Sequence, residues 1–240
     1  LELSKEIGEK THEENCLLGL GRLFDNLGQF SEAEKYFDAG YQIVIEVKDL
    51  GSESDYYWQR ALLYHHVGKN DQSLEFSLMA IEKAKEIGDQ EIEASALLIY
   101  GHSLVASGNL GDARDIYHQS LSIRKSMDQV HLLPEPQAGL ARIALLENKT
   151  EEALEIVDQI LRVCEDYDMN GCEEPLRVYL TCFRVLEANH DPRAEGILKK
   201  AYALLEQRAS MIEELYLRKS FLEIVEVNRE ISQAFAKLKY

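Results

Sequence analysis

A short turn motif recurs along the chain at a nearly constant spacing, and this repetition constrains the fold more than any other feature. Each copy runs from a glycine or asparagine to a small residue: Gly28–Ala33, Gly68–Ser73, Gly108–Ala113, Asn148–Ala153 and Asn189–Ala194. The first four copies are 40 residues apart, and the fifth follows after 41. Self-similarity with a period of roughly 20 to 50 residues indicates a stack of similar structural units.

Two further columns of small residues keep this step. They are Gly21, Ala61, Gly101, Ala141 and Cys182 in the first helix of each unit, then Gly40, Ala80, Ser120 and Ala201 in the second, with Ile160 as the exception. Small side chains at the contact let two antiparallel helices approach closely. The apolar residues follow helical spacing, and no alternating strand pattern occurs. We therefore predict an all-α solenoid of antiparallel helix pairs.

The columns divide residues 1–240, which we treat as a single solenoid, into repeats and a terminal cap. The repeats are predicted at about 11–50, 51–90, 91–130, 131–171 and 172–210, and residues 211–240 depart from the columns as C-terminal capping helices. Residues 1–8 match the helix end at 85–88, so we expect the chain to be a fragment of a longer array. Ser31-x-x-Glu34 is typical of a capping box and predicts Ser31 as a helix N-cap.

The small columns, with aromatic residues such as Phe24, Phe37, Tyr64 and Tyr117 between them, resemble the tetratricopeptide repeat (TPR). The 40-residue step resembles the longer-helix variant found in large bacterial signalling proteins. Residues 173–231 resemble the C-terminal TPR region of multidomain bacterial ATPases and transcription regulators, through Glu174–Leu186, Asp191–Ala194, Arg218–Glu223 and Asn228–Ile231. The resemblance implies a right-handed superhelical solenoid that follows an effector domain upstream in the full-length chain.

Charge and cysteine usage narrow the possible partners and the location. The formal net charge of −17 repels phosphates, which argues against nucleic acid and against an anionic membrane surface as partners. No stretch approaches the roughly 18 apolar residues that span a bilayer. The four cysteines include no C-x-x-C pair, so we expect free thiols in a reducing cytoplasm.

Motifs for catalysis and metal binding are missing from the sequence. It contains no glycine-rich phosphate loop, no G-x-S-x-G and no H-E-x-x-H. The adjacent histidines His65 and His66 point roughly 100° apart on a helix, so we interpret them as surface or groove residues. The sequence therefore predicts no enzyme activity, no cofactor and no metal site.

A ligand-binding groove can be placed by the resemblance, because the first helix of each pair lines the concave face in this repeat class. Our candidate protein- or peptide-binding groove consists of side chains at the helical positions of these first helices that would face it: Arg22, Trp58, His65, His102, Arg142, Tyr179 and Phe183. Arginines suit an acidic peptide or a small anion, and Trp58 offers an aromatic platform. The alternatives are that the arginines pair with carboxylates such as Asp25, and that Trp58 belongs to the core.

Three functions remain open on the sequence. The leading hypothesis is a non-catalytic protein- or peptide-binding scaffold, the sensor or interaction arm of a bacterial signalling protein. The second is a small-molecule sensor, in which Trp58, Tyr179 and Phe183 stack on a sugar or another ring. The third is a self-assembly module that uses the ends or the outer face of the array.

Overall fold

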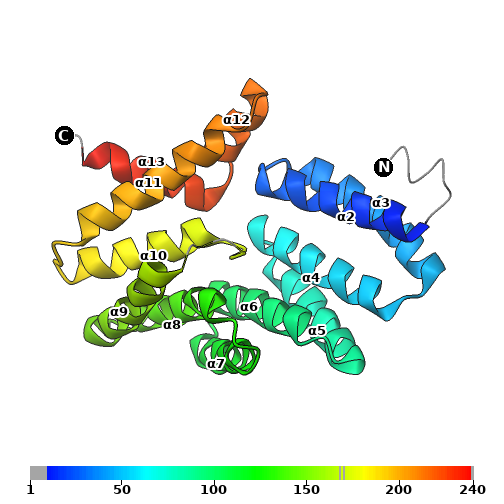
Figure 1. Ribbon diagram of the computed structural model, residues 1–240, viewed down its shortest axis with the longest axis horizontal. Coiled ribbons are helices and arrows are strands. Elements are labelled where there is room, and N and C mark those ends of the chain that lie inside the picture. Colours follow the sequence, from blue (N-terminus) through cyan, green and yellow to red (C-terminus); the bar gives the residue numbers. More distant parts are fainter. Residues whose placement is uncertain (1–9, 168, 170, 239–240) are drawn as a thin grey trace. The chain divides into compact units, whose positions relative to one another are not determined.

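The computed structural model describes residues 10–167, 169 and 171–238, and these residues form α-helices joined by short turns (Figure 1). The chain divides into two compact units, with the boundary between Gly108 and Asn109. Within each unit, consecutive helices pack as antiparallel pairs. The predicted all-α class and the TPR-like helix pairs are confirmed. Residues 1–8, on which the fragment hypothesis rests, lie outside the described residues.

Unit 1 is built from long helices of similar length, joined by connections of two or three residues. Its helices are α2 (Lys10–Asn26), α3 (Phe30–Val47), α4 (Leu50–His66), α5 (Asn70–Ile87) and α6 (Gln90–Ala106). The pairs α2–α3 and α4–α5 are in contact, and α5 also packs on α6. The first helices α2, α4 and α6 are neighbours in turn, since α4 contacts both of the others.

Unit 2 begins with a repeat-like pattern and ends in shorter helices. Its elements are α7 (Leu110–Ser126), the 3₁₀ helix η1 (Val130–Leu132), α8 (Pro134–Leu146), α9 (Thr150–Asp166), α10 (Pro175–Ala188), α11 (Ala194–Ser210), α12 (Leu215–Glu223) and α13 (Glu226–Lys237). The pairs α8–α9 and α10–α11 are in contact, and α8 also touches α10. Helix α13 packs on both α11 and α12 (Figure 1).

The predicted turn residues adopt the left-handed backbone that ends a helix. The φ angle is +72° at Gly28, +74° at Gly68, +82° at Gly108 and +61° at Asn148. At the fifth turn this conformation falls on His190, with φ +53°, one residue after Asn189. The Asn189 side chain instead donates hydrogen bonds to the Val185 and Thr150 carbonyls at 2.8 and 3.0 Å.

The start of α3 differs from the sequence prediction. The prediction that Ser31 caps a helix is wrong, because α3 begins at Phe30 and its N-cap is Gln29, which makes no side-chain cap. Side-chain caps come instead from Asp49 at the start of α4 and Asp89 at the start of α6. Asp49 accepts a hydrogen bond from the Ser52 N–H at 2.8 Å at the start of α4. Such caps satisfy N–H groups that have no partner inside the helix.

Small residues of the first helices lie directly against large aromatic rings of the second helices. A Cβ added at Gly21 would lie 2.7 Å from the ring of Phe37, and one added at Gly139 would lie 2.4 Å from the ring of Tyr117. Both rings are almost wholly buried and have no room to move. The glycines therefore let each ring pack against the backbone of the facing helix.

A buried carboxylic acid links the starts of α8 and α10. Glu135 is only 4% exposed, and its Oε1 accepts a hydrogen bond from the Glu174 N–H at 2.9 Å. Burial, reinforced by the nearby charges of Glu173 and Glu174, raises the pKa of Glu135 to about 7. The Glu135 carboxyl group therefore titrates close to neutral pH. The same group accepts a backbone hydrogen bond at the start of the next repeat.

Gly21→Ala should lower the free energy of unfolding by about 1–3 kcal/mol, because the new methyl group overpacks against the Phe37 ring. Gly19→Ala is the matched control on the same helix, since a Cβ there meets nothing within 4 Å. The control should be neutral or stabilising by up to about 1 kcal/mol, the gain in helix propensity. Denaturant unfolding of both variants makes the comparison. Equal effects at the two positions would show that close packing at Gly21 is unimportant.

Glu135→Gln should flatten the dependence of stability on pH. A folded-state pKa of about 7 lies above the ordinary value, so the unfolded chain binds fewer protons and stability falls as pH rises between the two values. The amide keeps the acceptor for the Glu174 N–H but carries no charge. We expect the variant to gain up to about 3 kcal/mol over the parent near pH 8 and little near pH 5, in urea unfolding at both pH values. A gain that is the same at both pH values would contradict the assignment.

Candidate functional site

Arg22 of α2 and Trp58 of α4 meet in unit 1. The guanidinium carbon of Arg22 lies 5.3 Å from the centroid of the Trp58 ring, within the range of a cation–π interaction. Trp58 is only 5% exposed, and its Nε1–H donates to the Asp55 carboxylate at 2.8 Å. The indole is therefore both part of the core and in contact with a half-buried cation.

Three histidines lie together at the C-terminal end of the first helices of unit 1. The ring of His65 on α4 is 5.5 Å from that of His102 on α6 and 6.1 Å from that of His66. His66 Nδ1 lies 3.0 Å from both carboxylate oxygens of Asp25, which is buried on α2. Asp25, the carboxylate considered as a partner for Arg22, is thus held by His66.

These contacts define what we call the first-helix face of unit 1: Arg22, Trp58, His65 and His102. Trp58 and His65 are seven residues apart, so they lie on the same side of α4 at a separation of about 10 Å. Arg22 reaches this line from α2, and His102 reaches it from α6. Four of the side chains that were predicted from helical phase therefore lie on α2, α4 and α6, and α4 contacts both of the other helices.

Arg142 of α8 is the candidate cation of unit 2. It is half-buried, and no hydrogen bond or ion pair to it occurs among the described residues. Burial lowers its pKa, and the positive charges of Arg177 and Arg184 on α10 lower it further, with partial compensation by Glu226. A cation in this position is destabilised until an anion approaches it.

Phe183 and Tyr179 on α10 differ in exposure. Phe183 is 7% exposed and belongs to the core of unit 2. Tyr179 is half-buried and lines two cavities, one of about 550 Å³ beside α11 and one of about 540 Å³ between α9 and α11. Cavities of this size are typical of small-molecule sites.

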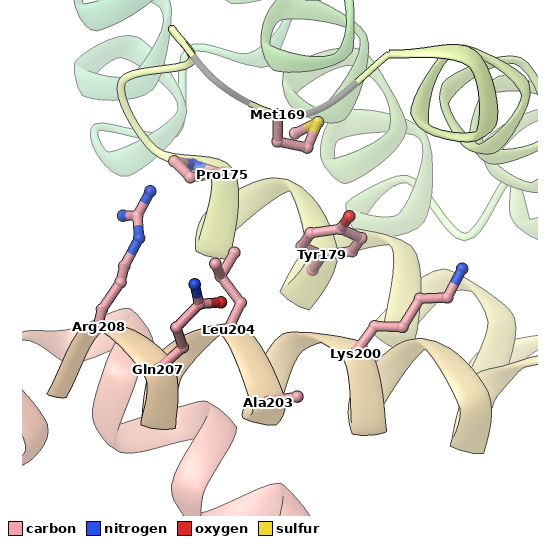
Figure 2. Close-up of a pocket in the computed structure, with 8 residues that line it drawn as sticks. All are labelled: Met169, Pro175, Tyr179, Lys200, Ala203, Leu204, Gln207 and Arg208. Carbon is pink, nitrogen blue, oxygen red and sulfur yellow. The ribbon is translucent and has the colours of Figure 1, made fainter. Parts of the chain in front are cut away.

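The cavity between α10 and α11 was not predicted from the sequence, because most of its polar side chains belong to a second helix. Figure 2 shows it with Tyr179 on α10 above the side chains of α11. Its lining residues are Met169, Pro175, Tyr179, Lys200, Ala203, Leu204, Gln207 and Arg208. The spacing of Lys200 and Arg208, eight residues apart on α11, is the sequence signal that could have indicated it.

The histidines, thiols and acids form no metal-binding cluster within the described part of the chain. No group of three or more histidine, cysteine or acidic side chains there is arranged to hold a metal ion. All four cysteines are free, and burial raises the pKa of Cys164 to about 11, which keeps this thiol protonated and weakly nucleophilic. No helix in the described ranges has the length and apolarity to cross a membrane.

Comparison with known families and structures agrees with this architecture. Residues 15–43, which include most of α2 and most of α3, match the family model of the tetratricopeptide repeat. No curated protein sequence matches the chain significantly.

Several solved structures share the fold. BtubC (BKLC) from P. vanneervenii is 17% identical, with a TM-score of 0.64 over 89% of this chain and 87% of its own. A Rap protein complexed with Competence and Sporulation Factor is 16% identical, with a TM-score of 0.64 over 95% of this chain and 66% of its own. A STAND signal-transduction ATPase with a TPR sensor from Pyrococcus horikoshii is 16% identical, with a TM-score of 0.60 over 95% of this chain and 36% of its own. At these identities the likeness concerns the fold.

Proposed function

We propose that this tetratricopeptide-repeat protein is a non-catalytic scaffold or sensor arm that holds an acidic segment of a protein or peptide on the first-helix face of unit 1. In this proposal Arg22 contacts a carboxylate of the ligand, and the edge of Trp58 packs on an adjoining side chain. His65 extends the contact toward α6, where it lies beside the buried His102. Binding involves no chemical step.

The observation that carries the proposal is the convergence of a cation and aromatic rings from α2, α4 and α6. Arg22 lies over Trp58, and His65 lies beside His102. The ring beneath Arg22 limits the side-chain freedom that the arginine loses when it binds a ligand, which favours binding. In a chain of net charge −17, the guanidinium of Arg22 offers an acidic ligand a local countercharge.

The structural relatives support a role in signalling. One is complexed with a factor named for competence and sporulation, and another carries its TPRs as a sensor in a larger ATPase. We propose by analogy that this chain belongs to a bacterial regulator with an effector domain upstream. Four free cysteines support the proposal of a cytoplasmic location.

Small-molecule sensing is a second candidate function. It is favoured by the cavity of about 550 Å³ between α10 and α11, which has aromatic, apolar and polar walls. This site belongs to unit 2 and uses none of the residues of the first-helix face of unit 1. The two functions can therefore be tested separately.

Arg22→Ala should weaken binding of an acidic peptide roughly 10- to 100-fold, the loss of one hydrogen bond to a charged group. Peptides selected on the native chain from a displayed acidic library would be measured by calorimetry against both variants. Lys35→Ala is the control, because Lys35 is an exposed cation on the second helix α3 that forms a surface ion pair with Glu32. It should change affinity less than about twofold. Equal losses in the two variants would sink the assignment to the first-helix face.

A further inference from the structure

The cavity between α10 and α11 is positively charged. Its polar lining consists of Lys200, Gln207, Arg208 and the Tyr179 hydroxyl, and none of the lining residues that the structure describes is a carboxylate. The chain carries 43 acidic residues against 26 basic ones, so a cavity of this size with cations alone departs from the rest of the molecule. Its charge is that of a site for an anion.

Both cations of the cavity are solvent-exposed, and Lys200 also lines the neighbouring cavity, which contains Asp158 and Glu165. Among the residues that the structure describes, neither Lys200 nor Arg208 has an ion pair or a side-chain hydrogen bond. Neighbouring cations on the surface of unit 2 differ in this respect: Lys199 pairs with Glu195, and Arg193 pairs with Asp158 and Asp191. Partial burial lowers the pKa of Arg208. An arriving anion would relieve that burial penalty.

The spacing of these side chains gives the length of the ligand. Lys200, Leu204 and Arg208 follow one another at intervals of four residues, so they form one stripe of α11. Eight residues of helix separate the two cations by about 12 Å along the axis. Figure 2 shows Lys200 and Arg208 at opposite ends of the cavity with Leu204 between them, and Tyr179 on the facing helix.

We propose that the cavity between α10 and α11 binds an elongated dianion, a small molecule with a carboxylate or phosphate at each end of an apolar spacer. Arg208 binds one end, Lys200 binds the other, and the spacer lies on Leu204 and against the Tyr179 ring. Gln207 adds a hydrogen-bond donor beside Arg208. This inference rests on the second candidate function, small-molecule sensing, and is independent of peptide binding in unit 1.

The test is calorimetric titration of the chain with decanedioate and with the bisphosphonate of the same chain length. The comparison ligands are butanedioate, which is too short to reach both cations, the decane diamine, and a neutral oligosaccharide. We expect saturable binding of the long dianions at millimolar concentration or below, with butanedioate at least about tenfold weaker. Relative affinities of the carboxylate and phosphonate ligands identify which anionic group the site prefers.

Matched variants locate the binding. Lys200→Gln with Arg208→Gln should weaken the long dianions at least about tenfold, because two charge-assisted contacts are lost. Lys199→Gln with Lys219→Gln removes the same charge from exposed positions outside the cavity and should have little effect. Equal weakening in both double variants would overturn the inference, since it would indicate an effect of net charge alone.

The outcomes also separate the inference from the function on which it rests. Binding of the oligosaccharide, but of no dianion, would overturn the inference and leave small-molecule sensing in place. Binding of none of these ligands would overturn the inference and remove the cavity as support for that function. Arg22→Ala should leave dianion affinity unchanged, and a loss in that variant would place the site elsewhere and overturn the inference.

Discussion

The close approach of antiparallel helices is the constraint on which the rest of this structure depends. In each unit a glycine of a first helix accepts an aromatic ring of a second helix, Phe37 at Gly21 and Tyr117 at Gly139, with no space for even one methyl group. Protein interiors are packed as densely as organic crystals, so these contacts fix the separation and rotation of the helices. Arg22 directly follows Gly21 in the chain, and its position over Trp58 is set by the same packing.

The consequence of this packing is that the two faces of a first helix have different roles. One face of α2 holds the small residues that meet α3, and the adjoining face carries Arg22 and Asp25 toward α4. A rigid helix presents such side chains with less disorder than a loop does, which lowers the entropy lost on binding. The repeat therefore supplies a scaffold, and the chemistry of each site comes from residues outside the repeated columns.

How much the sequence predicts depends on whether a feature repeats. The turn glycines and small columns recur, and they correctly predict the helix pairs. The predicted position of the fifth turn is wrong by one residue, and the predicted N-cap of α3 is wrong by two. Single side-chain hydrogen bonds and local backbone contacts decide such boundaries. Trp58 and Arg22 are selected by helical phase, and the structure brings them together.

The features that the sequence does not predict depend on contacts between repeats. The raised pKa of Glu135 requires the backbone of Glu174, about one repeat further along the chain. The cavity beside Tyr179 requires space between α10 and α11. Its two cations, Lys200 and Arg208, have no counterparts at the equivalent positions of the other repeats. Neither property is encoded in a local motif, so both follow only from the packed structure.

The most direct test of the central claim uses Trp58, the single tryptophan of the chain. A peptide that binds on the first-helix face of unit 1 must change the environment of this indole and of the guanidinium above it. Titration with a selected acidic peptide should therefore change the tryptophan emission with the same midpoint as the calorimetric heat. Saturable heat with an unchanged emission spectrum would place the ligand elsewhere and contradict the account.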